Sequence, residues 1–153
     1  MIILTGYQGF IGQAFKKRLD PENLYRIEQS GAFDFLNQYD KWDEVEMIIH
    51  QGAISSTTET DVNKIHKYNV EFSIALFEKA IEYSIPVKYA SSASVYGKIH
   101  SEYGYLKKTI NPLNFYALSK ATVDYWVMDN MDRFEQVQGL SLIHISEPTR
   151  RYR

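Results

Sequence analysis

The stretch Thr5-Gly6-Tyr7-Gln8-Gly9-Phe10-Ile11-Gly12 decides how this 153-residue chain folds. It follows an apolar run, Ile2-Ile3-Leu4, and opens a segment with apolar residues at helical spacing, so the order is strand, glycine turn, helix. In that setting the first glycine permits a tight turn, the second lets the backbone approach a pyrophosphate, and the third lets the helix pack closely on the strand. The free N–H groups at the start of the helix attract phosphates. The spacing predicts a dinucleotide-binding turn, and the alternative is a glycine-rich turn without a ligand.

The composition of the whole chain fits one ordinary globular domain. Hydrophobic residues make up 44% and charged residues 24%, and the net charge is -2. There is no basic and aromatic stripe that indicates a nucleic-acid surface, and no run of about 18 apolar residues that predicts a membrane span. Cysteine is absent and the histidines lack ligand spacing, so neither a disulfide nor a metal site is expected. A first strand at Ile2 leaves no room for a signal peptide, and we expect a cytoplasmic protein.

A second strand is predicted at residues 24–27, and it ends at Glu28. In a dinucleotide fold an acid at this place bonds the ribose hydroxyls, so Glu28 is a candidate cofactor ligand, with a solvated surface acid as the alternative. Few basic residues lie nearby, which favours NAD over NADP. Residues 29–44 leave little room for the helix that normally follows, and we expect a loop there.

A buried third strand is predicted over residues 45–50, followed by Gly52 and Ala53 and then by the hydroxyl-rich segment 55–60. Small residues after a strand let a ligand approach the backbone, so Gly52 and Ala53 are candidate cofactor contacts. Hydroxyls suit contacts with sugars, and the alternative is a helix-capping loop. The candidate substrate contacts are Ser55, Ser56 and Thr57.

The longest helix is predicted over residues 62–83, and it carries two apolar stripes on nearly opposite faces. The first stripe comprises Ile65, Tyr68, Phe72, Leu76 and Ala80. The second stripe comprises Val70, Ile74, Phe77 and Ile81. One stripe can pack on the sheet, and the other needs a second partner, either a neighbouring helix or another subunit. We expect it to meet the helix predicted over residues 114–131 across a two-fold subunit interface.

A Tyr-x-x-x-Lys pair lies on that last helix. Tyr116 and Lys120 are four residues apart, so they share a helical face. A lysine ammonium beside a phenol favours the tyrosinate, which can take a proton from an alcohol near neutral pH. Alone the pair is weak evidence. It gains weight from the glycine turn and from a strand predicted over residues 85–90, which runs into Ser91-Ser92-Ala93-Ser94-Val95-Tyr96-Gly97.

Together these three motifs resemble the extended short-chain dehydrogenases/reductases, in the group of nucleotide-sugar epimerases and dehydratases. The resemblance covers residues 1 to about 139 and implies an α/β fold, a Rossmann-type doubly wound parallel sheet that ends before the substrate domain. It implies that Tyr116 is the general base, Lys120 its partner, and Ser92 the hydroxyl that bonds the reacting oxygen. It also implies a nucleotide-sugar substrate and NAD or NADP as cofactor. The cofactor contacts it implies are Gly6, Gly9, Phe10, Ile11, Gly12, Asn69, Tyr116 and Lys120.

Within that group, residues 50–61 are similar to the ADP-glyceromanno-heptose 6-epimerases, which oxidise a sugar carbon transiently. Dehydratases of the group carry an Asp-Glu pair where this chain has Ala93-Ser94, which argues against dehydration. The alternatives are a UDP-sugar 4-epimerase or nucleotide-sugar oxidoreductase of the same group, and a non-catalytic dinucleotide-binding module. Because the family places a second catalytic base and the sugar-binding domain further along, we expect this chain alone to be inactive. We also expect the full-length protein to be a homo-oligomer.

The C-terminal segment 140–153 resembles the translation of a sequencing adapter, and the family resemblance stops where it begins. We therefore expect residues 1–139 to form an incomplete NAD(P)-binding Rossmann domain and residues 140–153 to be a non-native tail. The apolar front of the tail can add a strand near residues 141–145, because β-prone segments pair with an open sheet edge.

Overall fold

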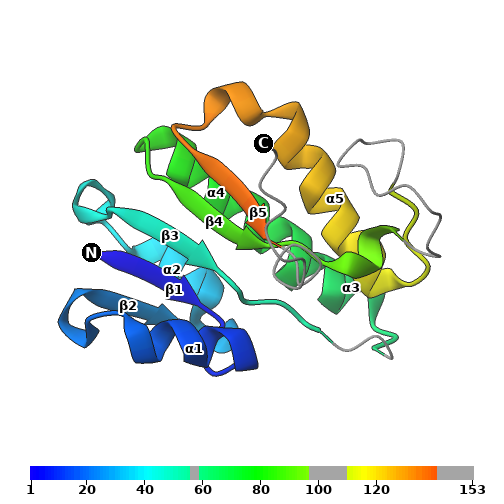
Figure 1. Ribbon diagram of the computed structural model, residues 1–153, viewed down its shortest axis with the longest axis horizontal. Helices are drawn as coiled ribbons and strands as arrows, with labels where there is room; N and C mark the ends of the chain where they lie inside the picture. Colours follow the sequence, from blue (N-terminus) through cyan, green and yellow to red (C-terminus); the bar gives the residue numbers. More distant parts are fainter. Residues whose placement is uncertain (56–58, 97–109, 141–153) are drawn as a thin grey trace, which may run out of the picture.

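Five parallel strands form the centre of the computed structural model, which describes residues 1–55, 59–96 and 110–140 (Figure 1). The strands are β1 (Ile2–Thr5), β2 (Leu24–Ile27), β3 (Met47–His50), β4 (Val87–Ala90) and β5 (Val137–Leu140). Their order across the sheet is β2-β1-β3-β4-β5, and every neighbouring pair is parallel. The chain runs from β1 to one edge and then returns across β1 towards the other, so the predicted doubly wound α/β sheet is confirmed.

The neighbouring strands β1 and β3 bring the ends of the first and third predicted strands together. β1 and β3 pair along their whole length, from Ile2 with Met47 to Thr5 with His50. Both strands form because their apolar side chains are buried, as is usual in parallel sheets. These side chains are Ile3, Leu4, Ile48 and Ile49. The carboxyl ends of β1 and β3 adjoin where the strand order reverses, which is the place where ligands bind in such sheets.

The return from β2 to β3 differs from the prediction. α1 (Phe10–Arg18) follows β1 as expected, but residues 29–44 contain α2 (Ala32–Gln38) where a loop was expected. Ala32 and Phe35 are buried, and the Phe35 ring contacts the ring of Trp42 at a centroid distance of 5.3 Å. The expectation of a loop was wrong because this short helix gains its stability from tertiary packing rather than from length. The crossover is nevertheless short, and β2 forms an edge of the sheet.

One helical stretch leads to β4, and its winding changes in the middle. α3 (Val62–Ile65) and α4 (Phe72–Glu82) are joined by the π-helical segment η4 (His66–Glu71). A π turn holds more residues than an α turn, so the side chains after it are rotated relative to those before it, and such turns are frequent at functional sites. The segment carries Asn69, which is only 1% exposed. The periodicity of the sequence predicted the helix but not this change of winding.

Most side chains in the two apolar stripes of this helical stretch are buried within the chain, whereas Tyr68, Ile74 and Ile81 are partly exposed. Phe77 of the second stripe contacts the rings of Tyr89 on β4 and Trp126 on the last helix. That helix, α5 (Phe115–Asp129), packs against α3, η4 and α4 of the same chain. The two helices therefore meet inside one chain, where α5 packs on the second stripe, and a meeting of these helices across a subunit interface stays a prediction.

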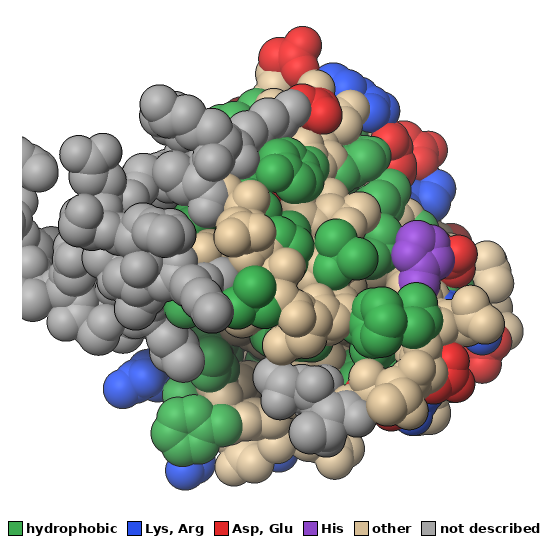
Figure 2. Space-filling view, turned by 90° about the vertical axis from the view of Figure 1, so that its right-hand side faces the viewer, with side chains coloured by type: hydrophobic (Ala, Val, Ile, Leu, Met, Phe, Trp, Pro, Cys, Tyr) green, Lys and Arg blue, Asp and Glu red, His purple; other side chains and the backbone are tan. Residues whose placement is uncertain are grey.

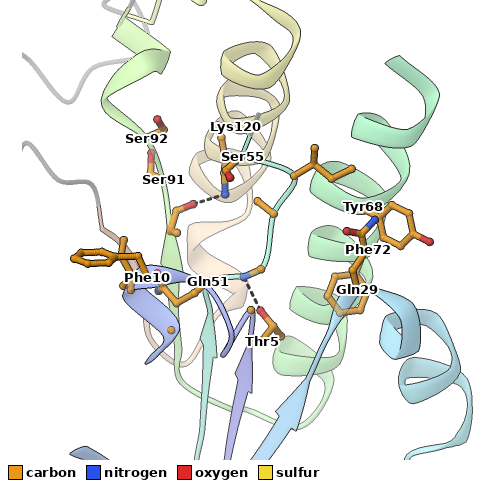
Figure 3. Close-up of a pocket in the computed structure, with 18 of the residues that line it drawn as sticks. Thr5, Phe10, Gln29, Gln51, Ser55, Tyr68, Phe72, Ser91, Ser92 and Lys120 are labelled. Atoms are coloured by element: carbon orange, nitrogen blue, oxygen red, sulfur yellow. Dashed lines mark hydrogen bonds between the residues drawn. The ribbon is translucent and has the colours of Figure 1, made fainter. Parts of the chain in front are cut away.

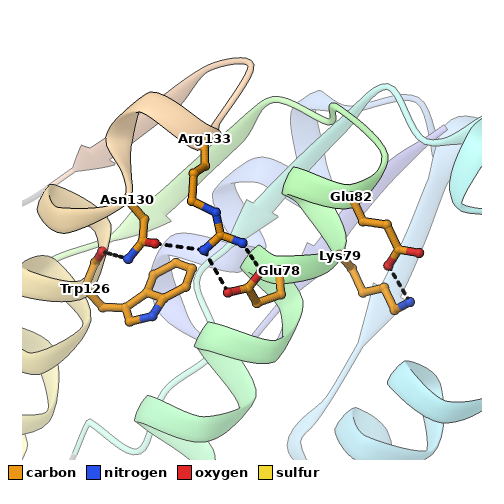
Figure 4. A network of polar contacts seen from close by, with 6 residues as sticks. All are labelled: Glu78, Lys79, Glu82, Trp126, Asn130 and Arg133. Carbon is orange, nitrogen blue, oxygen red and sulfur yellow. Dashed lines mark hydrogen bonds and ion pairs between the residues drawn. The ribbon is translucent and has the colours of Figure 1, made fainter.

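A network of exposed polar groups joins the end of α5 to α4 (Figure 4). Both guanidinium nitrogens of Arg133 donate to the carboxylate of Glu78, at 2.7 and 3.1 Å, and Arg133 also donates to Asn130. Pairs of this kind on the surface contribute at most about 1 kcal/mol, so packing of the apolar core accounts for most of the helix placement.

Within the described ranges, no helix combines the length and hydropathy that crossing a membrane requires.

Candidate active site

A pocket of about 500 Å³ opens at the carboxyl ends of the strands (Figure 3). Its walls come from the glycine turn after β1, the end of β2, the segment after β3, the end of β4 and the first turns of α5. Figure 3 shows Lys120 and Ser92 towards one side, Gln29 and Phe72 towards the other, and Thr5 between them. The predicted site residues in its lining are Gly6, Gly9, Phe10, Ile11, Gly12, Glu28, Gly52, Ala53, Ser55, Ser92, Tyr116 and Lys120. The fold thus brings the predicted catalytic residues and, except for Asn69, the predicted cofactor-binding residues to one cavity.

Two of the three turn glycines have steric reasons to be glycine. Gly6 has a φ of +66°, and a Cβ atom built on it would lie 2.7 Å from the backbone of Gly52. A Cβ atom on Gly12 would lie 2.0 Å from the carbonyl oxygen of Gly6, so α1 could not approach the turn with any side chain there. Both contacts close the turn tightly, and this leaves the start of α1 facing the pocket with no side chain capping it. That arrangement is suited to a phosphate group.

The acid predicted at the end of the second strand is joined to the glycine turn. Glu28 follows β2 and lines the pocket, and its Oε1 accepts a hydrogen bond from the backbone N–H of Gln8 at 3.0 Å. The bond fixes one carboxylate oxygen and leaves the other able to accept from a ligand hydroxyl. Glu28 is therefore placed where an acid can meet the ribose of a bound dinucleotide.

The backbone after β3 is held at two points. The Gly52 N–H donates to Thr5 Oγ1 at 2.9 Å, which ties the segment to the end of β1. Two residues later, the Ile54 N–H donates to Asn69 Oδ1 at 2.7 Å, and Asn69 Nδ2 donates back to the Ile54 carbonyl at 3.0 Å. Asn69 Nδ2 also donates to Ser119 Oγ on α5 at 3.0 Å. Asn69 was predicted as a cofactor contact, but it lies behind the pocket wall and holds that wall in place.

A buried histidine, which the sequence analysis did not assign to the site, connects these anchors. The Ser73 hydroxyl donates to the Asn69 carbonyl, so His50 must donate from Nε2 to Ser73 Oγ, at 2.7 Å. His50 Nδ1 then accepts from the Thr5 hydroxyl, also at 2.7 Å. Burial, followed by the charge of Lys120, lowers the pKa of His50 to about 3. His50 is therefore neutral at physiological pH and supports both anchors of the segment after β3.

The predicted catalytic residues occupy the side of the pocket formed by β4 and α5. Lys120 is only 5% exposed, and its Nζ donates to the Ala90 carbonyl at 2.8 Å. Burial lowers the pKa of Lys120 to about 8, and the charge of Asp124 opposes this effect. Ser92 and Ser94 share a hydrogen bond of 2.7 Å between their hydroxyls. Ser92, Tyr116 and Lys120 all line the pocket, so a hydroxyl, a phenol and an ammonium face the same space.

The comparisons with known proteins agree with this geometry. The model of the NAD dependent epimerase/dehydratase family matches residues 2–145. The chain belongs to the NAD dependent epimerase/dehydratase family. An ADP-L-glycero-D-manno-heptose-6-epimerase of Fusobacterium nucleatum is 32% identical to it over 183 aligned positions, which cover 97% of this chain and 53% of that protein. The chain thus spans about half the length of the curated relative it matches.

Solved structures of the same class share the fold. The ADP-L-glycero-D-manno-heptose-6-epimerase of Helicobacter pylori superposes with a TM-score of 0.71 at 23% identity, over 92% of this chain and 54% of that one. The UDP-glucose 4-epimerase of Brucella ovis, in complex with NAD, gives 0.72 at 19% identity, over 92% and 50%. The dTDP-4-dehydrorhamnose reductase of Bacillus anthracis, in complex with NADP, gives 0.74 at 16% identity, over 92% and 52%. This family member therefore has the Rossmann-type sheet of nucleotide-sugar enzymes.

The family motifs account for part of the pocket only. Gln29 and Ala32 line it from the start of the second crossover, and Tyr68 and Phe72 line it from the long helix. Tyr68 and Phe72 are four residues apart in the first apolar stripe, so their spacing signalled an apolar surface but not its exposure to a cavity. Ser55 lines the pocket as predicted, whereas Ser56 and Thr57 lie outside the described residues. The predicted strand near residues 141–145 also lies outside them.

Proposed function

We propose that this chain is the cofactor-binding and catalytic half of a nucleotide-sugar epimerase, similar to the heptose 6-epimerases, that works by transient oxidation of its sugar. The observation that carries the proposal is the pocket itself. One cavity is lined by the glycine turn after β1 and, on its other side, by Ser92, Tyr116 and Lys120. A non-catalytic dinucleotide-binding module would have no need of a hydroxyl, a phenol and a lysine at that side of the pocket.

The residues present fit a nicotinamide dinucleotide. The turn at Gly6 and Gly12 leaves backbone N–H groups at the start of α1 for the pyrophosphate, since no side chain occupies that space. Glu28 stands at the end of β2 for the adenosine ribose, and Gly52 and Ala53 line the pocket after β3 with small side chains. Lys120 stands near the other end for the second ribose. When bound, the nicotinamide supplies the acceptor and then the donor of the hydride that a transient oxidation requires.

The side chains of this chain would handle the proton and the sugar oxygen. We assign to Tyr116 the removal of the proton from the sugar hydroxyl and its later return. The Lys120 ammonium, one helical turn away, stabilises the negative charge on the phenol oxygen, and burial of Lys120 strengthens that interaction. We assign to Ser92 the hydrogen bond that holds the reacting oxygen. The neighbouring Ala93 offers no acid for eliminating water, which supports epimerisation over dehydration.

Glu28 supports NAD as the cofactor in preference to NADP. A carboxylate accepts hydrogen bonds from the two ribose hydroxyls of NAD, whereas the 2′-phosphate of NADP would place a second negative charge beside it. Near the end of β2, Arg26 stacks on the ring of Tyr7, with 5.6 Å from its guanidinium carbon to the ring centroid.

A nucleotide sugar is the proposed substrate, with Ser55 and Ser92 as polar contacts in the described part of the pocket. Residues 56 and 57 continue the same hydroxyl-rich segment in the sequence. The sugar is proposed as a heptose because the curated relative from Fusobacterium nucleatum, at 32% identity, is named for one. That assignment is a proposal about a full-length protein, because the curated relative is about twice as long as this chain.

We also propose that the protein is a cytoplasmic homo-oligomer. Apolar side chains are exposed where α3 and α5 begin, and these two helices contact each other. The residues are Val62, Leu113, Phe115 and Leu118, of which Leu113 is 61% exposed. Figure 2 shows hydrophobic side chains gathered on this side of the molecule. Exposed apolar groups of this kind usually mark protein contacts.

Titration of the 153-residue chain with NADH, followed by nicotinamide fluorescence, tests the proposal. We expect weak but saturable binding, and a Gly12→Ala variant should lose it, because its Cβ would meet the Gly6 carbonyl at 2.0 Å. Gly31→Ala is the matched control, since a Cβ at Gly31 meets nothing within 4 Å. No binding to the unmodified chain at millimolar NADH would reject the proposed function.

A further inference from the structure

Asp124 is a buried acid on α5 that none of the family motifs explains. It is 5% exposed and lies one helical turn after Lys120. Its Oδ1 accepts from the Tyr89 hydroxyl at 2.7 Å and its Oδ2 from the Ser91 hydroxyl at 2.6 Å. We propose that Asp124 is a positioning residue for Lys120: its carboxylate fixes the catalytic helix to the end of β4 and holds the lysine ammonium charged.

The first half of this role is geometric. Three consecutive residues at the end of β4 bond two residues of α5 that are one turn apart. Tyr89 and Ser91 donate to Asp124, and the Ala90 carbonyl between them accepts from Lys120 Nζ. Contacts of this kind fix both the distance and the rotation of α5 against the strand. The next residue in the chain is Ser92, so the same contacts set the position of the Ser92 hydroxyl relative to Lys120.

Space for this arrangement is provided by β5. A Cβ atom built on Gly139 would lie 2.8 Å from the Tyr89 hydroxyl oxygen and 2.9 Å from the ring carbon that bears it. Gly139 pairs with Tyr89 across the two strands. A side chain at position 139 would therefore require the Tyr89 ring to shift from the position in which its hydroxyl reaches Asp124.

The second half of the role is electrostatic. Burial raises the pKa of Asp124, whereas the bonds from Ser91 and Tyr89 and the charge of Lys120 act to lower it. Both oxygens of Asp124 accept from hydroxyl donors, and this pattern fits the ionised carboxylate, which has no proton to donate. Burial first, and then the charge of Asp124, raise the pKa of Tyr89, so Tyr89 stays a donor. Burial also penalises the charged form of Lys120, and the Asp124 carboxylate counteracts that penalty.

The other titratable groups around Lys120 do not supply this counter-charge. His50, on β3, is neutral because burial lowers its pKa to about 3. Tyr89, on β4, remains protonated. Tyr96, after β4, interacts with Tyr89. Asp124 is therefore the standing negative charge in this part of the described site.

The test measures the Lys120 titration directly, in the whole 153-residue chain without cofactor, by NMR of ¹³Cε-labelled lysines. Asp124→Asn keeps the shape of the side chain and removes its charge, and we expect the Lys120 pKa to fall by about one unit or more. Ser91→Ala is the matched control, because it removes one hydrogen bond and leaves the carboxylate ionised. It should leave the Lys120 titration nearly unchanged. A folded Asp124→Asn variant with the Lys120 titration of the unmodified chain would overturn the proposal.

A second measurement covers the case in which Asp124→Asn does not fold. In the unmodified chain, the Lys120 ¹³Cε resonance should show an additional inflection at the acidic pH where the Asp124 ¹³Cγ resonance titrates, because coupled groups sense each other's charge. Absence of that inflection overturns the proposal without any variant. A solely structural role for Asp124 would move neither lysine signal.

The functional consequence rests on the proposed function and has its own readout. If Lys120 bonds the cofactor ribose as an ammonium, Asp124→Asn should weaken NADH binding several-fold at pH 7.5, and the difference should shrink at pH 6, where Lys120 is protonated in both proteins. Failure of NADH binding in the unmodified chain would reject the proposed function and leave the lysine titration standing. An unchanged lysine titration would reject the role of Asp124 and leave NADH binding standing.

Discussion

Asn69 holds both backbone polar groups of Ile54, accepting from its N–H at 2.7 Å and donating to its carbonyl at 3.0 Å. The asparagine side chain thereby acts as a strand partner for a segment that has left the sheet. It can do so because the π-helical turn η4 (His66–Glu71) carries it, and because its amide also reaches Ser119 on α5. One buried side chain therefore connects the pocket wall to the helix that bears Tyr116 and Lys120.

We predict that Asn69→Ala lowers the free energy of unfolding by about 2–4 kcal/mol. The substitution leaves the N–H and carbonyl of Ile54 and the Ser119 hydroxyl without this partner, and each buried group left unpaired costs about 1–3 kcal/mol. Urea unfolding followed by circular dichroism measures the loss. Asn63→Ala, at an exposed position of the same helical stretch, should change the value by less than about 0.5 kcal/mol. Equal effects of the two substitutions would show that the Asn69 contacts are unimportant.

The pH dependence of stability should report the buried His50. Its pKa is lowered from 6.5 to about 3, so between these values the unfolded chain binds a proton that the folded chain does not. Stability is then fully present above pH 6.5 and is lost as the pH falls, by up to about 1.4 kcal/mol per pH unit for one proton.

Comparing His50→Asn with the unmodified chain isolates this contribution. The variant should be less stable at pH 7, because it loses hydrogen bonds to Thr5 or Ser73, but its stability should fall less between pH 7 and pH 5. Over that range most carboxylates stay ionised. His66→Asn, which changes an exposed histidine, should keep the steep dependence of the unmodified chain. A His50→Asn variant with that same dependence would assign the proton to another group.

Glu28→Gln should shift the cofactor preference towards NADPH. The amide keeps an oxygen that can accept from the Gln8 N–H, so the glycine turn retains its bond while the negative charge is removed. Two unit charges about 4 Å apart repel by about 1 kcal/mol in water, so the ratio of NADPH to NADH affinity should rise at least about fivefold. Fluorescence titrations with both cofactors measure this ratio. Glu22→Gln, which neutralises an exposed acid before β2, should leave the ratio where it was.

The parts of the fold that the sequence predicted are those in which local pattern and tertiary packing agree. Apolar runs followed by glycine or serine mark the ends of β1, β3 and β4, and these ends meet because parallel strands point the same way. The helix α2 was missed because its start at Ser30-Gly31 was interpreted as a loop. The positions Ala32, Phe35, Leu36 and Tyr39 have helical spacing and would have revealed it.

The polar network of the site was beyond the reach of sequence patterns. Thr5, His50 and Ser73 lie on three separate elements, and nothing in the local sequence of any one of them indicates the other two. The π turn was equally hidden, because one extra residue in a turn barely changes an apolar periodicity over 21 residues. Asp124 looks like an exposed acid on an amphipathic helix until β4 and β5 are placed beside it.

Tyr116→Phe should remove most of the turnover of a full-length protein. Such a protein would include the region that the relatives have and this chain does not span. The phenol carries the proton transfer, which commonly contributes about 10²–10⁴-fold in rate. NADH affinity should stay within a few-fold, because the phenyl ring still fills its place in the pocket lining. Steady-state rates and cofactor titrations on the same preparation separate the two effects. Near-normal turnover would place the general base elsewhere.

We propose that the folded domain ends at β5. The Ser91 N–H donates to the Leu140 carbonyl at 2.8 Å, and β5 pairs with β4 from Val137 to Leu140. Removal of residues 137–153 should therefore cost several kcal/mol, since it strips β4 of a neighbouring strand and uncovers Tyr89. Removal of residues 141–153 alone should change the free energy of unfolding by less than about 0.5 kcal/mol, as for a segment outside the core. Urea unfolding of the two truncated chains measures the difference. A loss of several kcal/mol with the shorter truncation would show that residues 141–153 belong to the fold, and it would contradict their interpretation as a non-native tail.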